Sequence, residues 1–320
     1  MLTCNASGRM AVEMRAVVTG ANGFVGKHLC RYLRSQGDQV TEVRGPPVGK
    51  DDHDGFSIDV TEPDGIRQVL EEVRPEAVFH LAGFSSVRKS RDEPARAFAV
   101  NALGAVHLLA AARDLAPKAR ILLIASAEVY GAVPTGTRAN EDFPLTPLSP
   151  YASSKVSAEA AGFQFFRAYR LEVISPRPFN HLGKGQDPSF VVPSIARQIE
   201  SIRLGRSPPV LKAGDLTVVR DFSHVSDVVE AYRLLAIRGE PGQAYNVCSG
   251  EGRTIRSVLD EMLELSGVRP RIEVDSSLLR PNDVPSLIGD PTKLLRLGWT
   301  PSHSIKDALR DVLAEAASAR

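Results

Sequence analysis

From Arg15 to Asn180 the sequence alternates short apolar runs, rich in β-branched residues, with longer segments of helical period. The apolar runs are "RAVVTG", "QVTEVR", "AVFHLAG", "ARILLIAS" and "LEVISPRPFN". Helical segments such as "FVGKHLCRYLRSQG" and "SPYASSKVSAEAAGFQFFRAYR" separate them. Apolar strands joined by helices of this length are typical of βαβ units. The pattern therefore predicts an α/β fold with a doubly wound parallel sheet, covered by helices on both faces.

After Asn180 the alternation changes, which indicates a second and smaller α/β domain. "VVPSIARQIESIRLG" is typical of a helix, "PPVLKAGDLTVVRDF" suggests a hairpin, and "VSDVVEAYRLLAI" with "AYNVCSG" could return to the main sheet. We expect a loose extension at 1–14, a nucleotide-binding domain at 15–180 plus about 219–248, and a C-terminal substrate domain at 181–218 plus about 249–320. The first 14 residues lack the apolar core of a signal peptide.

Composition excludes several classes of partner. The net charge is +1 and no block of Lys and Arg stands out, so we expect neither nucleic acid nor an anionic membrane surface as a partner. No apolar run approaches the roughly 20 residues needed to span a bilayer. The three cysteines, Cys4, Cys30 and Cys248, are scattered, which suggests neither disulfides nor a metal site and fits a reducing cytoplasm.

The stretch "GANGFVG" places Gly20, Gly23 and Gly26 directly after the first strand and at the start of a helix. Glycines permit the tight turn and let backbone N–H groups approach a pyrophosphate at the positive end of the helix. This position in a βαβ series predicts a Rossmann-type dinucleotide site that includes Phe24 and Val25.

The end of the second strand bears on which dinucleotide binds. An acidic side chain there bonds the ribose 2′-hydroxyl of NAD, whereas an Arg accommodates the 2′-phosphate of NADP. Arg44 stands at this end, and the nearest acid, Glu42, comes two residues earlier. NADP(H) is therefore favoured over NAD(H), with a solvated Arg44 as the alternative interpretation.

"YASSK" puts Tyr151 and Lys155 on one face of a helix, one turn apart. An ammonium group beside a phenol is expected to lower the phenol pKa, so that Tyr151 can exchange a proton with a carbinol or carbonyl. Ser126 lies 25 residues upstream, at the carboxyl end of an apolar strand, where ligands bind in open α/β sheets. A surface Tyr–Lys pair is the alternative, and Ser126 favours catalysis.

Together, "GANGFVG", "HLAG", "VNALGAVHLL", "SAEVYG", "SPYASSK" and "RPFNHLGKGQ" resemble the extended short-chain dehydrogenase/reductase family, in its nucleotide-sugar branch. The resemblance runs from about Arg15 into the C-terminal region. It implies Ser126, Tyr151 and Lys155 as a catalytic triad, and Asn101 as a brace for the sheet end. It also implies a set of residues around the cofactor: Asp59, Val60, Leu81, Ala82, Gly83, Asn101, Tyr151, Lys155 and Pro178.

The second half is similar to the family members that act on GDP-sugars, on the motifs "RPFNHLGKGQDPSFVVPSIARQI", "RDFSHVSDVVEAY", "AYNVCSGEGRTI" and "LRPNDVPSLIGDPTKLLRLGWTP". A diphosphate needs cations, and Arg suits its oxygens, so Arg220 and Arg280 are candidates. An ion pair with Asp221 is the alternative for Arg220. The other residues expected at the substrate are Ser85, Asn180, Val191 and Val192, the two valines beside the guanine.

Glu128 decides between reactions. Two residues after Ser126, it matches the acid/base of a 4,6-dehydratase, whereas a 4-reductase needs only hydride, a Tyr151 proton and Ser126. "SAE" and "NHLGKGQ" are the reductase-like forms, so we expect reduction of the C4 ketone of GDP-4-dehydro-6-deoxy-D-mannose to GDP-D-rhamnose. GDP-mannose 4,6-dehydration, a nucleotide-sugar 4-epimerase, a purely structural Glu128 and a non-enzymatic NADP-binding scaffold remain alternatives.

The family resemblance also implies a homodimer, in the cytoplasm that the cysteine usage suggests. The expected interface uses the helices "AFAVNALGAVHLLAAA" and "SSKVSAEAAGFQFF", whose small residues suit close helix packing. Burial of the same residues against the sheet would explain them equally well.

Overall fold

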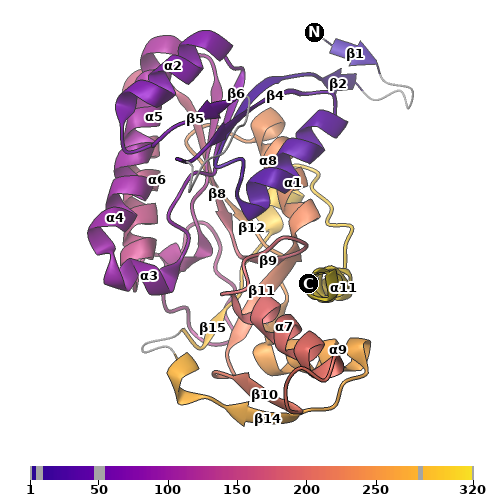
Figure 1. Cartoon of the computed structure of the whole chain (residues 1–320). Coiled ribbons are helices and arrows are strands. Elements are labelled where there is room, and N and C mark those ends of the chain that lie inside the picture. Colours follow the sequence, from indigo (N-terminus) through magenta and orange to yellow (C-terminus); the bar gives the residue numbers. More distant parts are fainter. Residues whose placement is uncertain (1, 5–9, 47–54, 280–283, 319–320) are drawn as a thin grey trace.

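The computed structural model describes residues 2–4, 10–46, 55–279 and 284–318. Leu2–Cys4 (β1) pairs antiparallel with Met10–Val12 (β2), and Figure 1 shows this pair at the periphery, next to the end of the main sheet.

Seven parallel strands form the main sheet. The order β12-β8-β7-β6-β3-β4-β5 makes β3 a central strand, with the chain winding outward from it in both directions. Every neighbouring pair is parallel, as the apolar alternation predicts. The strands are β3 (Arg15–Thr19), β4 (Gln39–Arg44), β5 (Phe56–Ser57), β6 (Ala77–His80), β7 (Arg120–Leu123), β8 (Glu172–Pro178) and β12 (Ala244–Val247).

Helices cover both faces of this sheet (Figure 1). On one face α1 (Phe24–Ser35) and α8 (Val225–Arg238) pack on the strands, with side chains such as Leu29 and Tyr232 fully or almost fully buried. On the other face lie α2 (Pro63–Val73), α5 (Gly104–Leu115) and α6 (Pro150–Tyr169), which bury a second apolar cluster. The fold class is therefore the one that the sequence predicts, a doubly wound Rossmann-type sheet.

One helical stretch, Pro94–Leu115, is long and apolar enough to cross a membrane by length and composition. It comprises α4 (Pro94–Phe98), a π-helical turn (Ala99–Leu103) and α5. Leu108 and Leu109 are completely buried against the sheet side of the molecule. Buried residues of this kind are also found in core helices of globular proteins, so length and composition make this stretch weak evidence for a membrane span.

A second region lies beyond the carboxyl ends of the main strands (Figure 1). Its small sheet is built around β11 (Val219–His224), which pairs with β9 (Asn180–Leu182), β13 (Gly252–Thr254) and β15 (Ser286–Leu287). Its helices α7 (Val191–Arg203), α9 (Ile255–Ser266) and α11 (Ile305–Ser318) share one apolar core. Of the expected segment 219–248, α8 and β12 join the main sheet, whereas β11 belongs to this smaller one.

The hairpin expected in "PPVLKAGDLTVVRDF" is wrong. β10 (Val210–Ala213) pairs in parallel with β14 (Arg271–Val274) instead of with β11. In the loop between β10 and β11, the Asp215 carboxylate accepts hydrogen bonds from the backbone N–H and the hydroxyl of Thr217, at 2.8 and 2.6 Å. This local turn directs the chain away from β10, so the two apolar runs reach different sheets.

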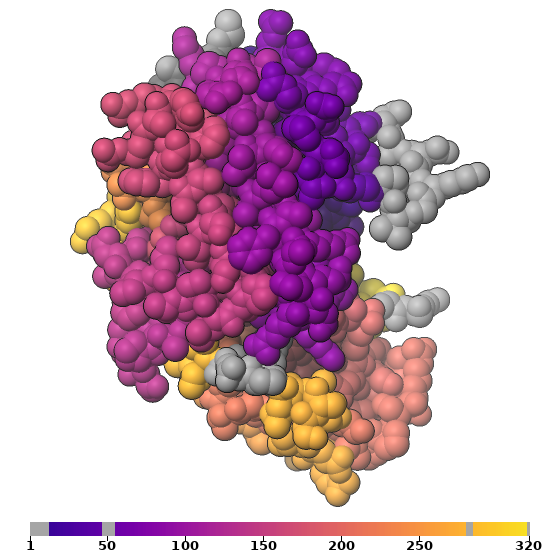
Figure 2. Space-filling view, turned by 90° about the vertical axis from the view of Figure 1, so that its left-hand side faces the viewer, coloured from indigo at the N-terminus to yellow at the C-terminus, as the bar shows by residue number. Residues whose placement is uncertain are grey.

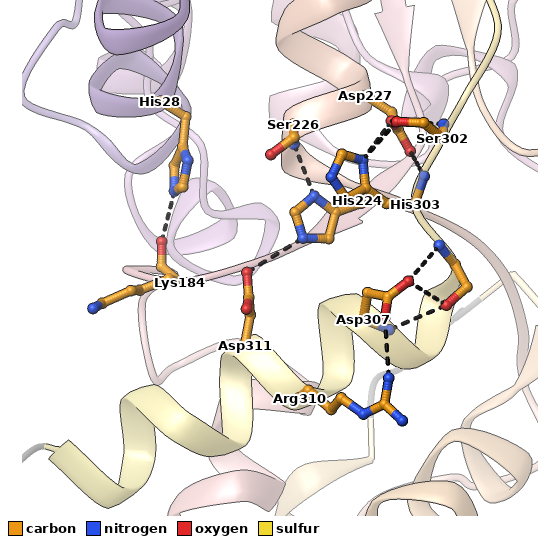
Figure 3. A network of polar contacts seen from close by, with 11 residues as sticks. His28, Lys184, His224, Ser226, Asp227, Ser302, His303, Asp307, Arg310 and Asp311 are labelled. Carbon is orange, nitrogen blue, oxygen red and sulfur yellow. Dashed lines mark hydrogen bonds and ion pairs between the residues drawn. The ribbon is translucent and has the colours of Figure 1, made fainter.

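The second region is tied to the main sheet by polar contacts around Asp227 at the start of α8 (Figure 3). This carboxylate, 1% exposed, accepts bonds from the backbone N–H groups of Ser302 and His303 and from Nδ1 of His303. The His303 ring stacks on His224, with centroids 4.4 Å apart, and His224 bonds to Asp311 on α11. The C-terminal helix is thus fastened to the end of β11.

The remaining short elements are α3 (Val87–Asp92), a 3₁₀ turn at Ala127–Tyr130, another at Ser276–Leu278, and α10 (Thr292–Leu295).

Candidate active site

A cavity of about 1760 Å³ runs between the main sheet and the second region. It begins at the glycine-rich turn after β3, passes the carboxyl ends of β4, β6, β7 and β8, and ends between α7 and β10. This is the edge at which ligands bind in doubly wound sheets. Its volume exceeds the roughly 300–1,000 Å³ of single-ligand pockets, so two ligands can lie end to end.

The glycine-rich turn forms a cradle that only glycine allows. Gly20 has φ +69°, and a Cβ there would lie 2.7 Å from the backbone nitrogen of Ala82. A Cβ on Gly26 would lie 2.2 Å from the carbonyl oxygen of Gly20. The turn therefore sits tight against the sheet and leaves the first N–H groups of α1 open to the cavity, which fits a dinucleotide pyrophosphate.

Arg44 lines the cavity at the end of β4. Its guanidinium bonds to Glu42 at 3.2 Å, and Arg34 of α1 bonds to the same carboxylate at 2.7 Å. Burial opposes ionisation of Glu42, but the bonds from Arg34 and Arg44 hold its pKa below the usual value. The acidic side chain near the ribose position is thus already satisfied by two cations, and Arg44 presents positive charge to the cavity.

Ser126 and Tyr151 lie together in the cavity wall. Their side chains share a hydrogen bond, and the Ser126 oxygen also accepts from the backbone N–H of Glu128 at 3.2 Å. Burial raises the pKa of Tyr151 to about 12, the Ser126 bond opposes this, and the Glu128 charge adds to it. The expected lowering of the Tyr151 pKa is therefore wrong, because desolvation outweighs the other contributions and keeps the phenol protonated.

Lys155 is buried below Tyr151 on α6. Its ammonium group donates to the carbonyl oxygen of Ile124 at 2.8 Å, and burial lowers its pKa to about 8. A Cβ on Gly83 would come within 3.5 Å of the same nitrogen. The Lys155 ammonium group therefore lies beside the Ile124 carbonyl oxygen and close to the backbone of Gly83, and its residue follows Tyr151 by one helical turn.

Two residues outside the chemistry fix the neighbourhood of Tyr151. The Ser90 oxygen on α3, completely buried, accepts a bond from the Tyr151 backbone N–H at 3.2 Å. Asn101 accepts from Phe84 N–H at 2.8 Å and donates to the Ser154 hydroxyl at 2.8 Å. Asn101 thus braces the loop after β6 against α6, and it is not among the described residues that line the cavity.

Glu128 also faces the cavity. It sits on the 3₁₀ turn that follows β7, and this turn closes at Gly131 with φ +62°. A Cβ on Gly131 would lie 1.8 Å from the carbonyl oxygen of Thr146, while the Thr146 hydroxyl donates to the Tyr130 carbonyl at 2.6 Å. The turn that carries Ser126 and Glu128 is therefore held rigidly at its far end.

The other residues that the sequence nominates also gather here. Asp59 lines the cavity with its carboxylate bonded to the N–H and hydroxyl of Thr61, which hold its pKa below the usual value. Arg220 is 8% exposed and bonds to the carbonyl oxygens of Val219 and Val284, at 2.9 and 2.7 Å. Asp221 accepts from Ser249, Gly250 and Gly289. The further cavity-lining candidates are Gly23, Phe24, Val25, Val60, Leu81, Ala82, Gly83, Ser85, Pro178, Asn180, Val191 and Val192, and Arg280 lies outside the described residues.

Sequence reasoning missed a set of cations on the same wall. The stretch "SVRKSRDEPAR" after Ser85 carries all of them except Lys212, and this density of Arg and Lys was the available signal. Among the described residues, the additional cavity-lining cations are Arg88, Lys89, Arg91, Arg96 and Lys212. They make the cavity suited to a ligand with several phosphates.

No group of His, Cys, Asp and Glu in the described part of the chain could hold a metal ion. Burial raises the thiol pKa of Cys30 to about 12, so this cysteine is unreactive.

Comparison with known proteins agrees with this geometry. The model of the family "GDP-mannose 4,6 dehydratase" matches residues 17–312. The chain is 36% identical over 306 residues to GDP-6-deoxy-D-mannose reductase of Pseudomonas aeruginosa, covering 95% of this chain and 97% of that protein. The structure of RMD from Pseudomonas aeruginosa complexed with NADPH superposes with a TM-score of 0.85 at 36% identity, over 95% of this chain and 99% of that one. UDP-glucose 4-epimerase of Thermus thermophilus with NAD gives 0.86 at 32% identity, over 96% and 100%.

Proposed function

The chain belongs to the GDP-mannose 4,6-dehydratase family of extended short-chain dehydrogenases/reductases, and we propose that within it this protein is an NADPH-dependent 4-reductase. Its substrate would be GDP-4-dehydro-6-deoxy-D-mannose and its product GDP-D-rhamnose. The observation that carries the proposal is the hydrogen bond between Ser126 and a Tyr151 phenol whose pKa is raised to about 12. A phenol that stays protonated is the proton donor that ketone reduction requires.

The glycine-rich turn after β3 indicates where the cofactor would bind. The turn with Gly20, Gly23 and Gly26 would hold the pyrophosphate, and Asp59 would lie near the adenine. Arg44 favours the 2′-phosphate of NADPH over the free hydroxyl of NADH, because Glu42 is already paired with two cations. When bound, the nicotinamide supplies the hydride.

At the reacting carbon, Tyr151 donates its proton to the C4 oxygen as negative charge develops there. Ser126 donates a hydrogen bond to the same oxygen and so stabilises the charge before the proton arrives. Lys155, charged below pH 8, stabilises the phenolate left behind.

The GDP part of the substrate would extend toward the second region. Arg220 and Arg280 suit the diphosphate, and Asn180 can donate to a phosphate oxygen. Val191 and Val192 at the start of α7 would flank the guanine, and Ser85 would contact the sugar. The main-sheet part thus serves as the cofactor half and the second region as the substrate half.

A GDP-mannose 4,6-dehydratase is the second candidate, because Glu128 lines the same cavity beside Ser126. In that reaction a carboxylate would act on the C5 proton and the C6 hydroxyl. In the reductase, Glu128 orients a sugar hydroxyl.

Incubation with GDP-mannose alone, without added reduced cofactor, separates the two candidates. A reductase leaves GDP-mannose unchanged and oxidises NADPH only when GDP-4-dehydro-6-deoxy-D-mannose is supplied. Accumulation of a 4-keto product from GDP-mannose would exclude the reductase assignment in favour of the dehydratase. The variant Glu128→Gln is the matched control, since only dehydration depends on its carboxylate.

We also propose that the protein is a cytoplasmic homodimer. Figure 2 faces the side of the molecule on which the helices α4, α5 and α6 lie. Three apolar side chains are exposed on neighbouring elements there: Phe98 on α4, Leu103 in the π-helical turn and Phe163 on α6, at 39%, 46% and 51% exposed. Apolar side chains gathered on one helix face favour a partner. Sedimentation of the protein and of Phe163→Lys tests this, because only a dimer through this face would dissociate in the variant.

A further inference from the structure

The two elements that carry the proposed chemistry are joined by one buried arginine outside the cavity. Arg177 lies near the end of β8 and is 5% exposed. Its Nε bonds to Glu159 at 3.0 Å, and its Nη2 bonds to the other oxygen of the same carboxylate. Its Nη1 donates to the Tyr130 hydroxyl and to the Glu141 carbonyl oxygen, both at 2.9 Å.

Each partner belongs to an element of the active site. Glu159 follows Tyr151 and Lys155 on α6 at successive spacings of four residues, so the three share one helix face. Tyr130 ends the 3₁₀ turn that begins after Ser126 and carries Glu128. None of Arg177, Tyr130 or Glu159 is among the described residues that line the cavity.

The Tyr130 end of this link is itself tightly held. Its hydroxyl donates to Oδ1 of Asn246 on β12 at 2.6 Å, and its ring is completely buried, with the Arg177 guanidinium 5.1 Å from the ring centroid. Asn246 in turn donates to the Ala139 carbonyl oxygen at 2.8 Å. Because each group is bonded on more than one side, the turn after β7 cannot shift without breaking several bonds.

We propose that Arg177 and Tyr130 are positioning residues that set the distance between the Ser126 hydroxyl and the Tyr151 phenol. The Arg177 guanidinium bonds to Glu159 on α6 and to Tyr130 on the turn after Ser126. The positions of both Tyr151 and Ser126 therefore depend on this one guanidinium group. An arginine is required, because only its planar fork serves a carboxylate and a hydroxyl at once. This inference rests on the proposed function only in so far as its kinetic test measures reduction of the keto sugar.

The test uses Tyr130→Phe, which removes one hydroxyl, and Arg177→Lys, which keeps the charge but loses the fork. Arg233→Lys is the matched control, since Arg233 also makes a bidentate buried ion pair, with Asp38, at the far end of α1. We expect kcat to fall about tenfold or more in the first two variants, as small displacements of reacting groups cost this much. The KM for NADPH should change less than about twofold, because the cofactor cradle is untouched.

The outcomes are distinct. An unchanged kcat in Tyr130→Phe and Arg177→Lys overturns the inference, and so does an equal loss in Arg233→Lys, which would mark a general effect of stability. If Arg177→Lys fails to fold, Tyr130→Phe alone decides, since it removes no charge.

A second readout needs no substrate. In protein with ¹³C-labelled tyrosine, the ring signal of Tyr151 is identified by its loss in Tyr151→Phe. It should shift in Tyr130→Phe and Arg177→Lys, as its bond to Ser126 changes, and stay in place in Arg233→Lys. If wild-type protein fails to reduce the keto sugar, the proposed function fails while this measurement still supports or overturns the positioning role.

Discussion

The ammonium group of Lys155 donates to the carbonyl oxygen of Ile124, two residues before Ser126. With a pKa lowered to about 8 by burial, Lys155 is charged below pH 8 and neutral above it. Tyr151, with a pKa of about 12, stays protonated across this range. We therefore predict that kcat/KM for ketone reduction falls as the pH rises through about 8, and that Lys155→Met removes this step. A flat profile to pH 10 would contradict the assignment.

Tyr151→Phe should lower the rate of reduction by at least about 100-fold, the usual scale for loss of an acid. The hydroxyl is removed but the ring still fills its buried position, so NADPH binding should stay within about twofold. Stopped-flow absorbance of NADPH and fluorescence titration measure the two quantities. Turnover equal to that of the wild type would remove Tyr151 from the mechanism.

Arg44→Gln should weaken NADPH binding roughly 10- to 100-fold, the range expected for loss of a hydrogen bond to a charged group. NADH binding should change little, because NADH has no 2′-phosphate. Arg34→Gln is the control: Arg34 contacts the same Glu42 but is not among the described cavity-lining residues. Equal weakening of NADPH and NADH binding in Arg44→Gln would show that Arg44 does not recognise the 2′-phosphate.

Gly131→Ala should destabilise the protein severely, because the new methyl group would lie 1.8 Å from the Thr146 carbonyl oxygen. Gly136→Ala is a matched control with φ +82° and no atom within 4 Å of the new Cβ. The control should cost only the strain of a left-handed residue, about 1–2 kcal/mol. Urea unfolding of both variants measures the difference, and equal losses would refute the steric argument.

His80 makes stability depend on pH. It is 3% exposed, its Nδ1 bonds to the Thr19 hydroxyl, and burial, with the nearby Lys155 charge, lowers its pKa from 6.5 to about 3. Between pH 6.5 and 3, His80 is therefore protonated in the unfolded chain but stays neutral in the folded chain. The free energy of unfolding is highest above pH 6.5 and decreases as the pH falls toward 3. Unfolding free energies should fall by about 1.4 kcal/mol per pH unit for this proton. His80→Asn should remove this contribution to the pH dependence of the free energy of unfolding. If the free energies of unfolding of the variant and the wild type changed in parallel with pH, this role of His80 would be contradicted.

Local patterns predicted the main sheet well, because most consecutive strands joined by a helix are also neighbours in it: β3 pairs with β4, β6 with β7, and β7 with β8. The segment from β9 to β14 was harder. The partner of β10 is β14, some 60 residues away along the chain, and an Asx turn at Asp215 decides against the nearer strand. Pairing at this distance leaves no local trace in the sequence.

In the active site too, some features can be predicted from local sequence and others depend on the folded structure. Glycines, Ser126 and Tyr151 could be found by spacing, but the pKa of Tyr151 depends on how completely the fold buries it. Arg177 could not be found at all from its neighbours, because its three partners, Glu159, Tyr130 and Glu141, come from separate stretches of chain. Its position between them exists only in the folded state.

The crossing of the chain between the two sheets has a consequence for synthesis on the ribosome. When residue 180 has emerged, every strand of the main sheet except β12 is present, but α8, which covers one face of the sheet together with α1, has not yet been made. The nascent chain must carry the apolar side chains that pack on Val228 and Tyr232 uncovered while more than 40 further residues are added. Chaperone capture during translation would therefore concentrate on this face, and would end when α8 leaves the exit tunnel.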